Sequence, residues 1–194
     1  MLNLMNAPTL TGRFVSLEPL VEAHREALRA AANDPRIWQF TLTRGDGDHF
    51  DRWFQDALAE RDAGRRVPFA VRRLQDGACL GSTSYLDIVP NHRRIEIGST
   101  WYRHDVWQSN VNPECKLLLL EHAFETLGVN RVALVTDALN ERSQAAIAKL
   151  GAVREGVLRS HMVSQGGRIR DSVVFSIVAG EWPATRDRLQ ARLT

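Results

Sequence analysis

Residues 93–136, RRIEIGSTWYRHDVWQSNVNPECKLLLLEHAFETLGVNRVALVT, carry the pattern that decides the fold. Apolar residues alternate over Arg93–Trp101, follow a helical period over Asn112–Leu127, and become a short β-branched run over Arg131–Thr136. A helix that joins two such strands brings them side by side in the same direction, because parallel strands need a crossover connection. We therefore expect one parallel pair of strands in this part of the sheet.

Both ends of the predicted helix carry capping residues. Asn112 is a good N-cap, Pro113 suits the first helical position, where its missing N–H is no loss, and Gly128 fits a left-handed C-terminal cap. The expected buried stripe of this helix consists of Leu117, Leu120, Phe124 and Leu127.

The sequence on both sides of this stretch also alternates between strand and helix patterns. On the N-terminal side we predict strands at Phe14–Leu17, Phe69–Arg73 and Cys79–Asp87, and helices at Glu22–Ala32 and His49–Asp62. On the C-terminal side we predict a helix at Asn140–Leu150, closed by Gly151, and a hairpin of Gly156–Ser164 and Arg168–Val178 around Gln165-Gly166-Gly167. Together these patterns predict an α/β (α+β) fold, with a mixed, twisted sheet of about seven strands flanked by helices.

Length and composition favour one domain that needs no covalent or metal staple. With 194 residues, 44% of them hydrophobic, the chain is expected to form a single domain over residues 1–194 and to bury roughly 70% of its unfolded surface. Cys79 and Cys115 show neither a CxxC spacing nor a histidine cluster, so we predict no zinc site and no disulfide framework. A reducing compartment is the corresponding expectation.

Charge and hydropathy argue against several classes of partner. The 25 basic and 23 acidic residues are interspersed, so we expect no basic footprint for a nucleic acid or an anionic membrane. Met1–Thr11 lacks the basic and apolar regions of a signal peptide, and no stretch approaches the ~20 apolar residues of a membrane span. We therefore expect a cytoplasmic protein.

The segment Trp101–Cys115 is the strongest candidate for a functional site. Here a strand leads through a loop to a helix N-terminus, where free backbone N–H groups and the helix dipole favour an anion. An ordinary strand-to-helix connection is the alternative that the local pattern leaves open.

Two further segments, Asn140-Glu141-Arg142-Ser143 and Lys149-Leu150-Gly151-Ala152, strengthen this candidate. Taken together, the three segments resemble the coenzyme A site of the GCN5-related N-acetyltransferase (GNAT) superfamily. The resemblance runs from Leu10 to about Trp182 and is nearest to the branch of ribosomal-protein N-terminal acetyltransferases. In that family a Gln/Arg-x-x-Gly-x-Gly/Ala loop wraps the pyrophosphate of acetyl-CoA. Aligning this loop places Trp107, Asn110 and Asn112 at the three signature positions.

None of these three residues is the usual one for the family. Asn tolerates a positive φ better than other non-glycine residues, so Asn110 is expected to replace the central glycine. Pro113 removes one N–H from the expected cradle, and Glu114 brings a negative charge unless its side chain points away. We nevertheless expect the loop to bind the pyrophosphate.

The resemblance also implies the remaining cofactor contacts. Asn140 corresponds to a residue that contacts the pantetheine arm, although it is equally suited to cap its helix. Ser143 corresponds to a residue thought to protonate the departing thiolate, and Lys149 or Arg142 is a candidate to meet a nucleotide phosphate. The expected cofactor-binding residues are Trp101, Tyr102, Trp107, Gln108, Ser109, Asn110, Val111, Asn112, Asn140, Ser143 and Lys149, and no metal is expected.

The reaction requires a base, because an amine attacks a thioester only when it is unprotonated. Glu96 is the first candidate: Ile95 and Ile97 share one face of the strand, so Glu96 points to the other, and the family often places its base on this strand. A simply solvated Glu96 is the alternative, and His161 is the second candidate base. Cys115, near a helix N-terminus, is a weaker candidate nucleophile, because no His and Asp or Asn set is recognisable around it.

The resemblance implies direct transfer of acetyl from acetyl-CoA to a primary amine in a ternary complex, without an acyl-enzyme. A strand N–H within residues 99–102 is expected to polarise the thioester oxygen. The helices within Glu22–Asp62 and the Gln165 turn are expected to wall the acceptor side.

Two alternatives to an acetyltransferase stay open: a coenzyme-A-binding protein without turnover, and an interaction module without a cofactor. The identity of the amine acceptor also stays open, as does the choice between a monomer and a homodimer.

Overall fold

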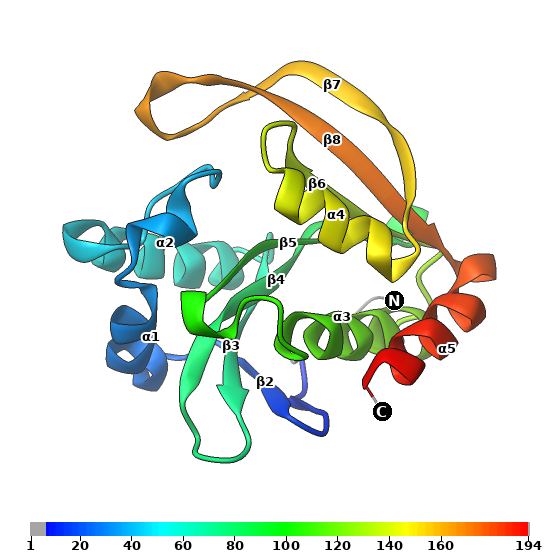
Figure 1. Ribbon diagram of the computed structural model, residues 1–194, viewed down its shortest axis with the longest axis horizontal. Helices are drawn as coiled ribbons and strands as arrows, with labels where there is room; N and C mark the ends of the chain where they lie inside the picture. The colour runs from blue at the N-terminus through cyan, green and yellow to red at the C-terminus, as the bar shows by residue number, and fades with distance from the viewer. Residues whose placement is uncertain (1–6, 194) are drawn as a thin grey trace.

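One continuous sheet organises the chain. In a computed structural model that describes residues 7–193, eight strands pair in the order β1-β2-β3-β4-β5-β6-β8-β7 (Figure 1). The strands are β1 Leu10–Thr11, β2 Val15–Pro19, β3 Val67–Arg73, β4 Cys79–Val89, β5 Arg94–Tyr102, β6 Arg131–Asp137, β7 Val153–Val163 and β8 Ile169–Val178. Within these residues β5 and β6 are the one parallel pair, and all other neighbours are antiparallel.

Five α-helices of the described chain cover the two faces of the sheet. They are α1 Arg25–Ala32, α2 Phe50–Asp62, α3 Val111–Glu121, α4 Glu141–Leu150 and α5 Trp182–Leu193. The larger core packs α3, α4 and α5 on one face, through Leu119, Ile147 and Leu189. A second core packs α1 and α2 on the other face, through Leu28 and Phe54. We call these the α3 face and the α2 face, and Figure 1 shows α1 and α2 grouped apart from α3 and α5.

The predicted mixed α/β architecture is confirmed. All seven predicted strands form, the expected parallel pair is β5 with β6, and β1 is an additional strand of two residues, too short for a sequence pattern. The helix predicted at Glu22–Ala32 begins with a 3-10 turn, Glu22–His24, before α1. Gly128 and Gly151 end their helices with positive φ angles of 64° and 97°, as expected.

The start of α3 differs from the prediction. Its first residue is Val111 and Asn110 occupies the N-cap position, so the assignment of Asn112 as the N-cap is wrong. The N–H of Glu114 donates to the carbonyl of Asn110 at 3.0 Å and begins the helical hydrogen bonding. Pro113 is therefore the third helical residue, where a missing N–H breaks no intrahelical bond.

The buried stripe of α3 differs as well. Val111, Cys115 and Leu119 are buried at a spacing of i, i+4. Of the expected stripe, Leu120 is buried, whereas Leu117, Phe124 and Leu127 are only half-buried. A π-helical turn, His122–Thr126, follows α3 and changes the phase of every later side chain. A strict 3.6-residue period therefore fails in this segment.

The strands β5 and β6 diverge after a short ladder. Three residue pairs join them, Arg94 with Arg131, Ile95 with Val132 and Glu96 with Ala133. Beyond these pairs β5 runs on to Tyr102 and β6 runs on to Asp137 with no pairing between them. The divergence begins at Glu96, and we call it the splay.

The hairpin of β7 and β8 forms one edge of the sheet, and its turn is the predicted one. Gly166 and Gly167 have φ angles of 75° and 79°, a region that residues with a Cβ rarely adopt. In Figure 1 the hairpin arches over the top of the molecule, and its turn reaches toward the side that holds α2. The Gln165 side-chain amide donates to the carbonyl of Trp38, which ties the turn to the segment before α2.

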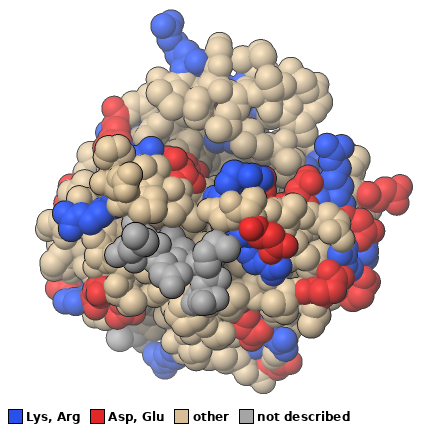
Figure 2. Space-filling model, turned by 180° about the vertical axis from the view of Figure 1, so that it is seen from behind, with Lys and Arg blue, Asp and Glu red and all other residues tan. Residues whose placement is uncertain are grey.

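The surface carries charges of both signs. On the face seen in Figure 2, basic and acidic side chains are interspersed in small groups. In the part of the chain that the structure describes, no helix combines the length and apolar character needed to cross a membrane. The expectation about a signal peptide concerns Met1–Thr11, of which residues 1–6 lie outside the described residues.

Candidate active site

The loop before α3 leaves backbone donors free. Among the described residues, the N–H groups of Gln108, Asn110 and Asn112 have no hydrogen-bond partner, and the Asn110 side chain does not cap the helix. These donors lie at the positive end of the α3 dipole, where unpaired N–H groups favour an anion. We call residues 107–112 the anion loop.

The backbone of the anion loop differs from the expected one. The positive φ of 61° lies at Gln108, whereas Asn110 is in the right-handed region with φ −75° and ψ −7°. The expectation that Asn110 replaces a positive-φ glycine is therefore wrong. Ser109 explains the difference, because its hydroxyl donates to the carbonyl of Val106 at 2.6 Å and accepts the N–H of Val111 at 3.3 Å. The turn is held by this side chain, immediately after the left-handed residue.

Glu114 points away from the anion loop. Its carboxylate accepts the backbone N–H groups of Arg13, Phe14 and Val15 at 2.6, 2.8 and 2.8 Å, next to the start of β2. Gly12 makes room for it, because a Cβ there would lie 2.6 Å from Glu114 Cδ. The Glu114 carboxylate thus links α3 to the start of β2. Its negative charge does not face the anion loop, so it does not repel an anion bound there.

The N-terminus of α4 lies beside the anion loop. The guanidinium of Arg142 covers the ring of Trp107, with Cζ 3.4 Å from the ring centroid. Trp107 is in turn held by its Nε1–H, which donates to the carbonyl of Tyr102 at 3.0 Å. The contact brings the two helix N-termini together and places a cation next to the free N–H groups.

Asn140 and Ser143 share the first turn of α4. Asn140 Oδ1 accepts the N–H of Ser143 at 3.0 Å, which confirms Asn140 as the N-cap. Ser143 is half-buried, and its hydroxyl makes no hydrogen bond to any described residue. That hydroxyl is free to bind a ligand at the helix N-terminus.

Glu96 occupies the point where β5 and β6 diverge. Its side chain lies on the α2 face, opposite the buried isoleucines of β5, and a Cβ added at Gly98 would lie 2.7 Å from Glu96 Oε1. Burial raises the pKa of Glu96 to about 7, with a smaller contribution from the charge of Asp87 and an opposing one from Arg170. A half-buried carboxyl with this pKa exchanges protons near neutral pH.

Two predicted cofactor residues keep their side chains inside the fold. Trp101 is buried on the α2 face, with ring centroids 5.2 Å from Trp38 and 5.3 Å from Trp53. Tyr102 is buried in the larger core on the opposite face. A ligand in the splay would therefore meet the backbone of these two residues.

Three other candidates lie apart from this site or lack the required reactivity. Lys149 is exposed in the last turn of α4, about 9 Å along the helix axis from Ser143. His161 is exposed on the edge strand β7. Cys115 is fully buried, and burial raises the pKa of its thiol to about 12, so it stays protonated and is no nucleophile.

Polar side chains that the sequence analysis did not single out lie on the same face as Glu96. The register of β5, β6 and β8 places Asp137, Arg170 and Ser172 on the α2 face, and all three are buried. Arg66, just before β3, is buried there too, and its Nε donates to Ser84 at 2.8 Å. The signal was present in β8, where polar Arg170, Ser172 and Ser176 alternate with apolar Val173, Phe175 and Ile177. When the polar face of a strand is buried in the fold, its side chains are candidates to bind a ligand.

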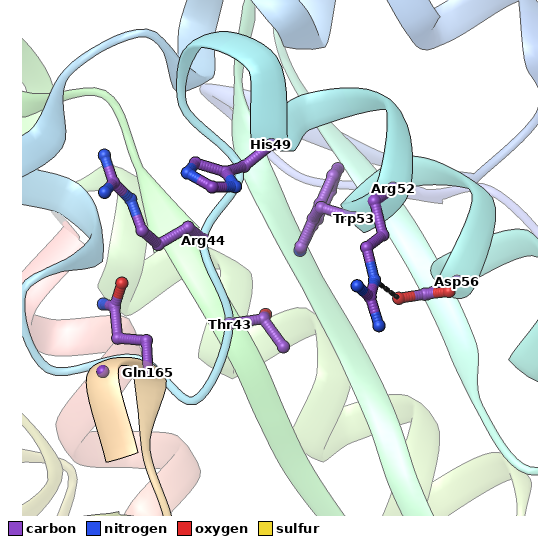
Figure 3. Close-up of a pocket in the computed structure, with 8 residues that line it drawn as sticks. Thr43, Arg44, His49, Arg52, Trp53, Asp56 and Gln165 are labelled. Carbon is purple, nitrogen blue, oxygen red and sulfur yellow. Dashed lines mark ion pairs between the residues drawn. The ribbon is translucent and has the colours of Figure 1, made fainter. Parts of the chain in front are cut away.

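A cavity of about 640 Å³ lies between α2 and the turn of the β7–β8 hairpin (Figure 3). Its lining residues are Thr43, Arg44, His49, Arg52, Trp53, Asp56, Gln165 and Gly166. Figure 3 shows Gln165 on one side and Trp53 on the other, with the Arg52–Asp56 ion pair at 3.8 Å. The two segments that the sequence predicted as walls of the acceptor side therefore face each other across this cavity.

Known proteins match this arrangement. A family model described as "Acetyltransferase (GNAT) domain" matches residues 15–153, well over half of the chain. The chain belongs to the GNAT acetyltransferase family. This confirms the resemblance to the GNAT superfamily that the sequence showed. In this GNAT chain, no group of three or more His, Cys, Asp or Glu side chains within residues 7–193 is arranged to hold a metal ion.

Individual relatives agree with the family. YoaA of Bacillus subtilis (strain 168), named an uncharacterized N-acetyltransferase, is 30% identical over 114 residues, which cover 59% of this chain and 63% of YoaA. The chain spans less than two thirds of the curated relatives that it matches, 63% of YoaA and 58% of YdaF from the same organism.

Solved structures share the whole fold of this GNAT chain. A GCN5-related N-acetyltransferase from Brucella melitensis has a TM-score of 0.89 and 28% identity, covering 96% of this chain and 86% of that one. A protein from T. thermophilus has a TM-score of 0.87 and 38% identity, covering 96% and 97%. RimJ of Mycobacterium smegmatis, solved in complex with CoA-disulfide, has the same fold, with a TM-score of 0.77 and 22% identity over 92% and 88%.

Proposed function

We propose that this GNAT protein transfers the acetyl group of acetyl-CoA to a primary amine. The splay carries the proposal, because three unpaired N–H groups lie at the helix N-terminus that follows β5, and a carboxyl with a near-neutral pKa lies where the strands diverge. A phosphorylated acyl donor needs the first feature and an attacking amine needs the second. RimJ of M. smegmatis, which shares the fold, was solved with CoA-disulfide, and this supports a coenzyme A site here.

The pyrophosphate of coenzyme A is placed on the anion loop. The N–H groups of Gln108, Asn110 and Asn112 donate to it, whereas the N–H of Val111 is already held by Ser109. Arg142 supplies a positive charge at the same point. The pantetheine arm then follows the splay past Asn140, whose Oδ1 forms the cap and whose side-chain N–H groups are left for the arm.

The reaction moves one proton from nitrogen to sulfur. The amine nitrogen forms the new C–N bond to the acyl carbon, the C–S bond breaks, and the electron pair of that bond leaves on the sulfur. The Glu96 carboxylate accepts the proton that nitrogen loses and releases it to solvent before the next turnover. The Ser143 hydroxyl donates a proton to the departing thiolate and regains one from solvent. A backbone N–H of β5 within residues 99–102 polarises the thioester oxygen.

The acceptor is placed on the α2 face, between α2 and the β7–β8 turn. Glu96 opens onto this face, and the cavity of Figure 3 lies on the same side of the sheet, because Trp53 in its lining packs against Trp101 of β5 at 5.3 Å. This cavity would receive the part of the acceptor that distinguishes one amine from another.

An amine-panel assay tests the proposal. The protein is mixed with acetyl-CoA and a broad set of amines, free thiol is followed over time, and binding of acetyl-CoA is measured separately by thermal shift. Turnover with at least one amine supports an acetyltransferase. Binding without turnover on any amine points instead to a coenzyme-A-binding protein of the same fold. Acetyl-CoA at 100 times its dissociation constant should stabilise the fold by about 2.7 kcal/mol, and no shift at millimolar acetyl-CoA would leave an interaction module.

A further inference from the structure

Arg170 on β8 is a buried cation with no hydrogen bond. It is 6% exposed, and none of its N–H groups donates to any described residue. Its ion pair joins Nε to Asp137 Oδ2 at 4.0 Å, a separation that is too long for a hydrogen bond. Arg66 on the same face donates through Nε to Ser84, although its Nη2 has no partner among the described residues.

A second unpaired donor lies next to Arg170. Ser172 is fully buried, and its hydroxyl has no partner among the described residues. The two residues are two positions apart on β8, so their side chains lie on the same face, about 7 Å apart at Cα. Buried donors without partners are rare in folded proteins, since each loses its hydrogen bonds to water. Two adjacent ones indicate an acceptor group supplied by a ligand.

This donor pair lies on the face where the amine must react. Glu96 of β5 pairs with Ala133 of β6, and β6 in turn pairs with β8 up to Asp137 opposite Ser172. Glu96, Asp137, Arg170 and Ser172 therefore share the α2 face of three successive strands. The charge of Arg170 is also close enough to lower the pKa of Glu96, against the larger effect of burial.

The charges on this face favour a ligand that carries both signs. Asp137 already accepts a hydrogen bond from the guanidinium of Arg168. Arg170 shares this carboxylate and reaches it only through Nε at 4.0 Å, so its charge is weakly paired, whereas Glu96 has no direct cation partner among the described residues. A ligand with a carboxylate and an amino group would match one charge to each.

We propose that the acceptor is an amine that also carries a carboxylate, of the amino-acid class. Its carboxylate binds Arg170 and Ser172, and its amino group faces Glu96. This inference rests on the proposed function, since it names the substrate class of the same site. A protein N-terminus lacks a carboxylate at this distance from the amine, and is the competing acceptor in the test.

Matched acceptors test the inference on the full chain. Each standard amino acid is compared with its C-terminal amide, which keeps the amine and the side chain but loses the carboxylate charge. In the unchanged protein, kcat/KM should be at least about 30-fold higher for the best amino acid than for its amide, because a buried charge pair contributes this much or more. Equal use of acids and amides, or a preference for amides, overturns the inference while the acetyltransferase proposal stands. Absence of turnover with every acceptor overturns both.

The variant Arg170→Met then shows whether Arg170 acts through the carboxylate. It should lower kcat/KM for the amino acid by about 30-fold or more, mainly through KM, and change the value for the amide by less than about threefold. Arg170→Lys should restore part of the loss for the acid. Arg159→Met removes an exposed cation from the same hairpin and should change neither acceptor. An equal loss for acid and amide in Arg170→Met would mean that Arg170 supports the fold or Glu96, and would overturn the carboxylate subsite.

Discussion

The two sides of the splay differ in the groups that they offer to a ligand, main-chain N–H groups on one side and a carboxyl side chain on the other. On the side of the helix N-termini, the anion loop offers the main-chain N–H groups of Gln108, Asn110 and Asn112. On the α2 face, the proposed chemistry depends on the side chain of Glu96. A site made of main-chain N–H groups tolerates changes of residue type as long as the backbone conformation is kept and no N–H is lost to proline. A loop without any glycine can therefore serve as the proposed pyrophosphate site, and substitutions on the two sides are predicted to differ sharply in effect.

The largest effect on the rate is expected on the α2 face, where the proposed chemistry depends on the Glu96 side chain. Glu96→Gln removes the proton acceptor with little change of shape and should lower kcat by about 100- to 10,000-fold. The KM for acetyl-CoA should change little, because Glu96 lies on the opposite side of the splay from the anion loop. Steady-state kinetics with Glu121→Gln as a matched control on α3 would measure both. A rate within a few-fold of the unchanged protein at saturating amine would exclude Glu96 as the base.

A large effect on stability, without an effect on the cofactor, is expected at Glu114. Glu114→Ala leaves one buried and two part-buried N–H groups without their charged acceptor and should lower the free energy of unfolding by about 3 kcal/mol. Urea unfolding measures this loss. The affinity for acetyl-CoA should not rise in the variant at a temperature where it stays folded. A tighter complex would mean that the carboxylate opposes the pyrophosphate, contrary to the geometry.

The pH dependence of the rate tests whether the Glu96 side chain acts as the base. Because the pKa of Glu96 is raised to about 7, its carboxylate predominates only above that pH. The value of kcat/KM should therefore rise with pH and level off above about 7, and at pH 5 it should be about 100-fold below the plateau. Glu96→Gln should lose this limb of the profile. An unchanged limb in the variant would assign it to another group.

The smallest effects are expected from side chains at the helix N-termini. Asn140→Ala removes the cap of α4 and should lower the free energy of unfolding by about 1 kcal/mol, whereas Asn140→Asp should retain most of it. Gln108→Ala and Asn112→Ala keep their backbone N–H groups, so the dissociation constant of acetyl-CoA should stay within about threefold. Thermal shift and calorimetric titration measure these changes. If either loop variant bound acetyl-CoA 30-fold or more weakly, the side chains and not the main chain would be responsible for binding the pyrophosphate.

Much of the fold was predictable because its signals are local. The change of period within residues 93–136, the cap at Asn140 and the glycines at the hairpin turn all act over a few residues, and each is confirmed. The face occupied by Glu96 also followed from strand alternation alone. The segments predicted to wall the acceptor side do line one cavity, whereas their role toward an acceptor stays a prediction.

The remaining features depend on contacts between distant residues. The start of α3 was misplaced because Ser109 holds the preceding turn through two hydrogen bonds, which no residue preference reveals. The direction of Glu114 is set by the N–H groups of residues 13–15, about a hundred positions away in the sequence. The polar row of β8 can be read from its alternation, but only the strand register shows that this row lies on the same face as Glu96.

The most direct test of the account is a titration of the ¹⁵N-labelled protein with coenzyme A, followed by amide NMR. The account predicts the largest downfield shifts at the N–H groups of Gln108, Asn110 and Asn112, which have no hydrogen-bond partner within residues 7–193. The N–H of Ser143, already bound to Asn140, should shift much less. Saturable binding that leaves the three loop amides unshifted, or that shifts Ser143 most, would contradict a pyrophosphate site on the main chain before α3.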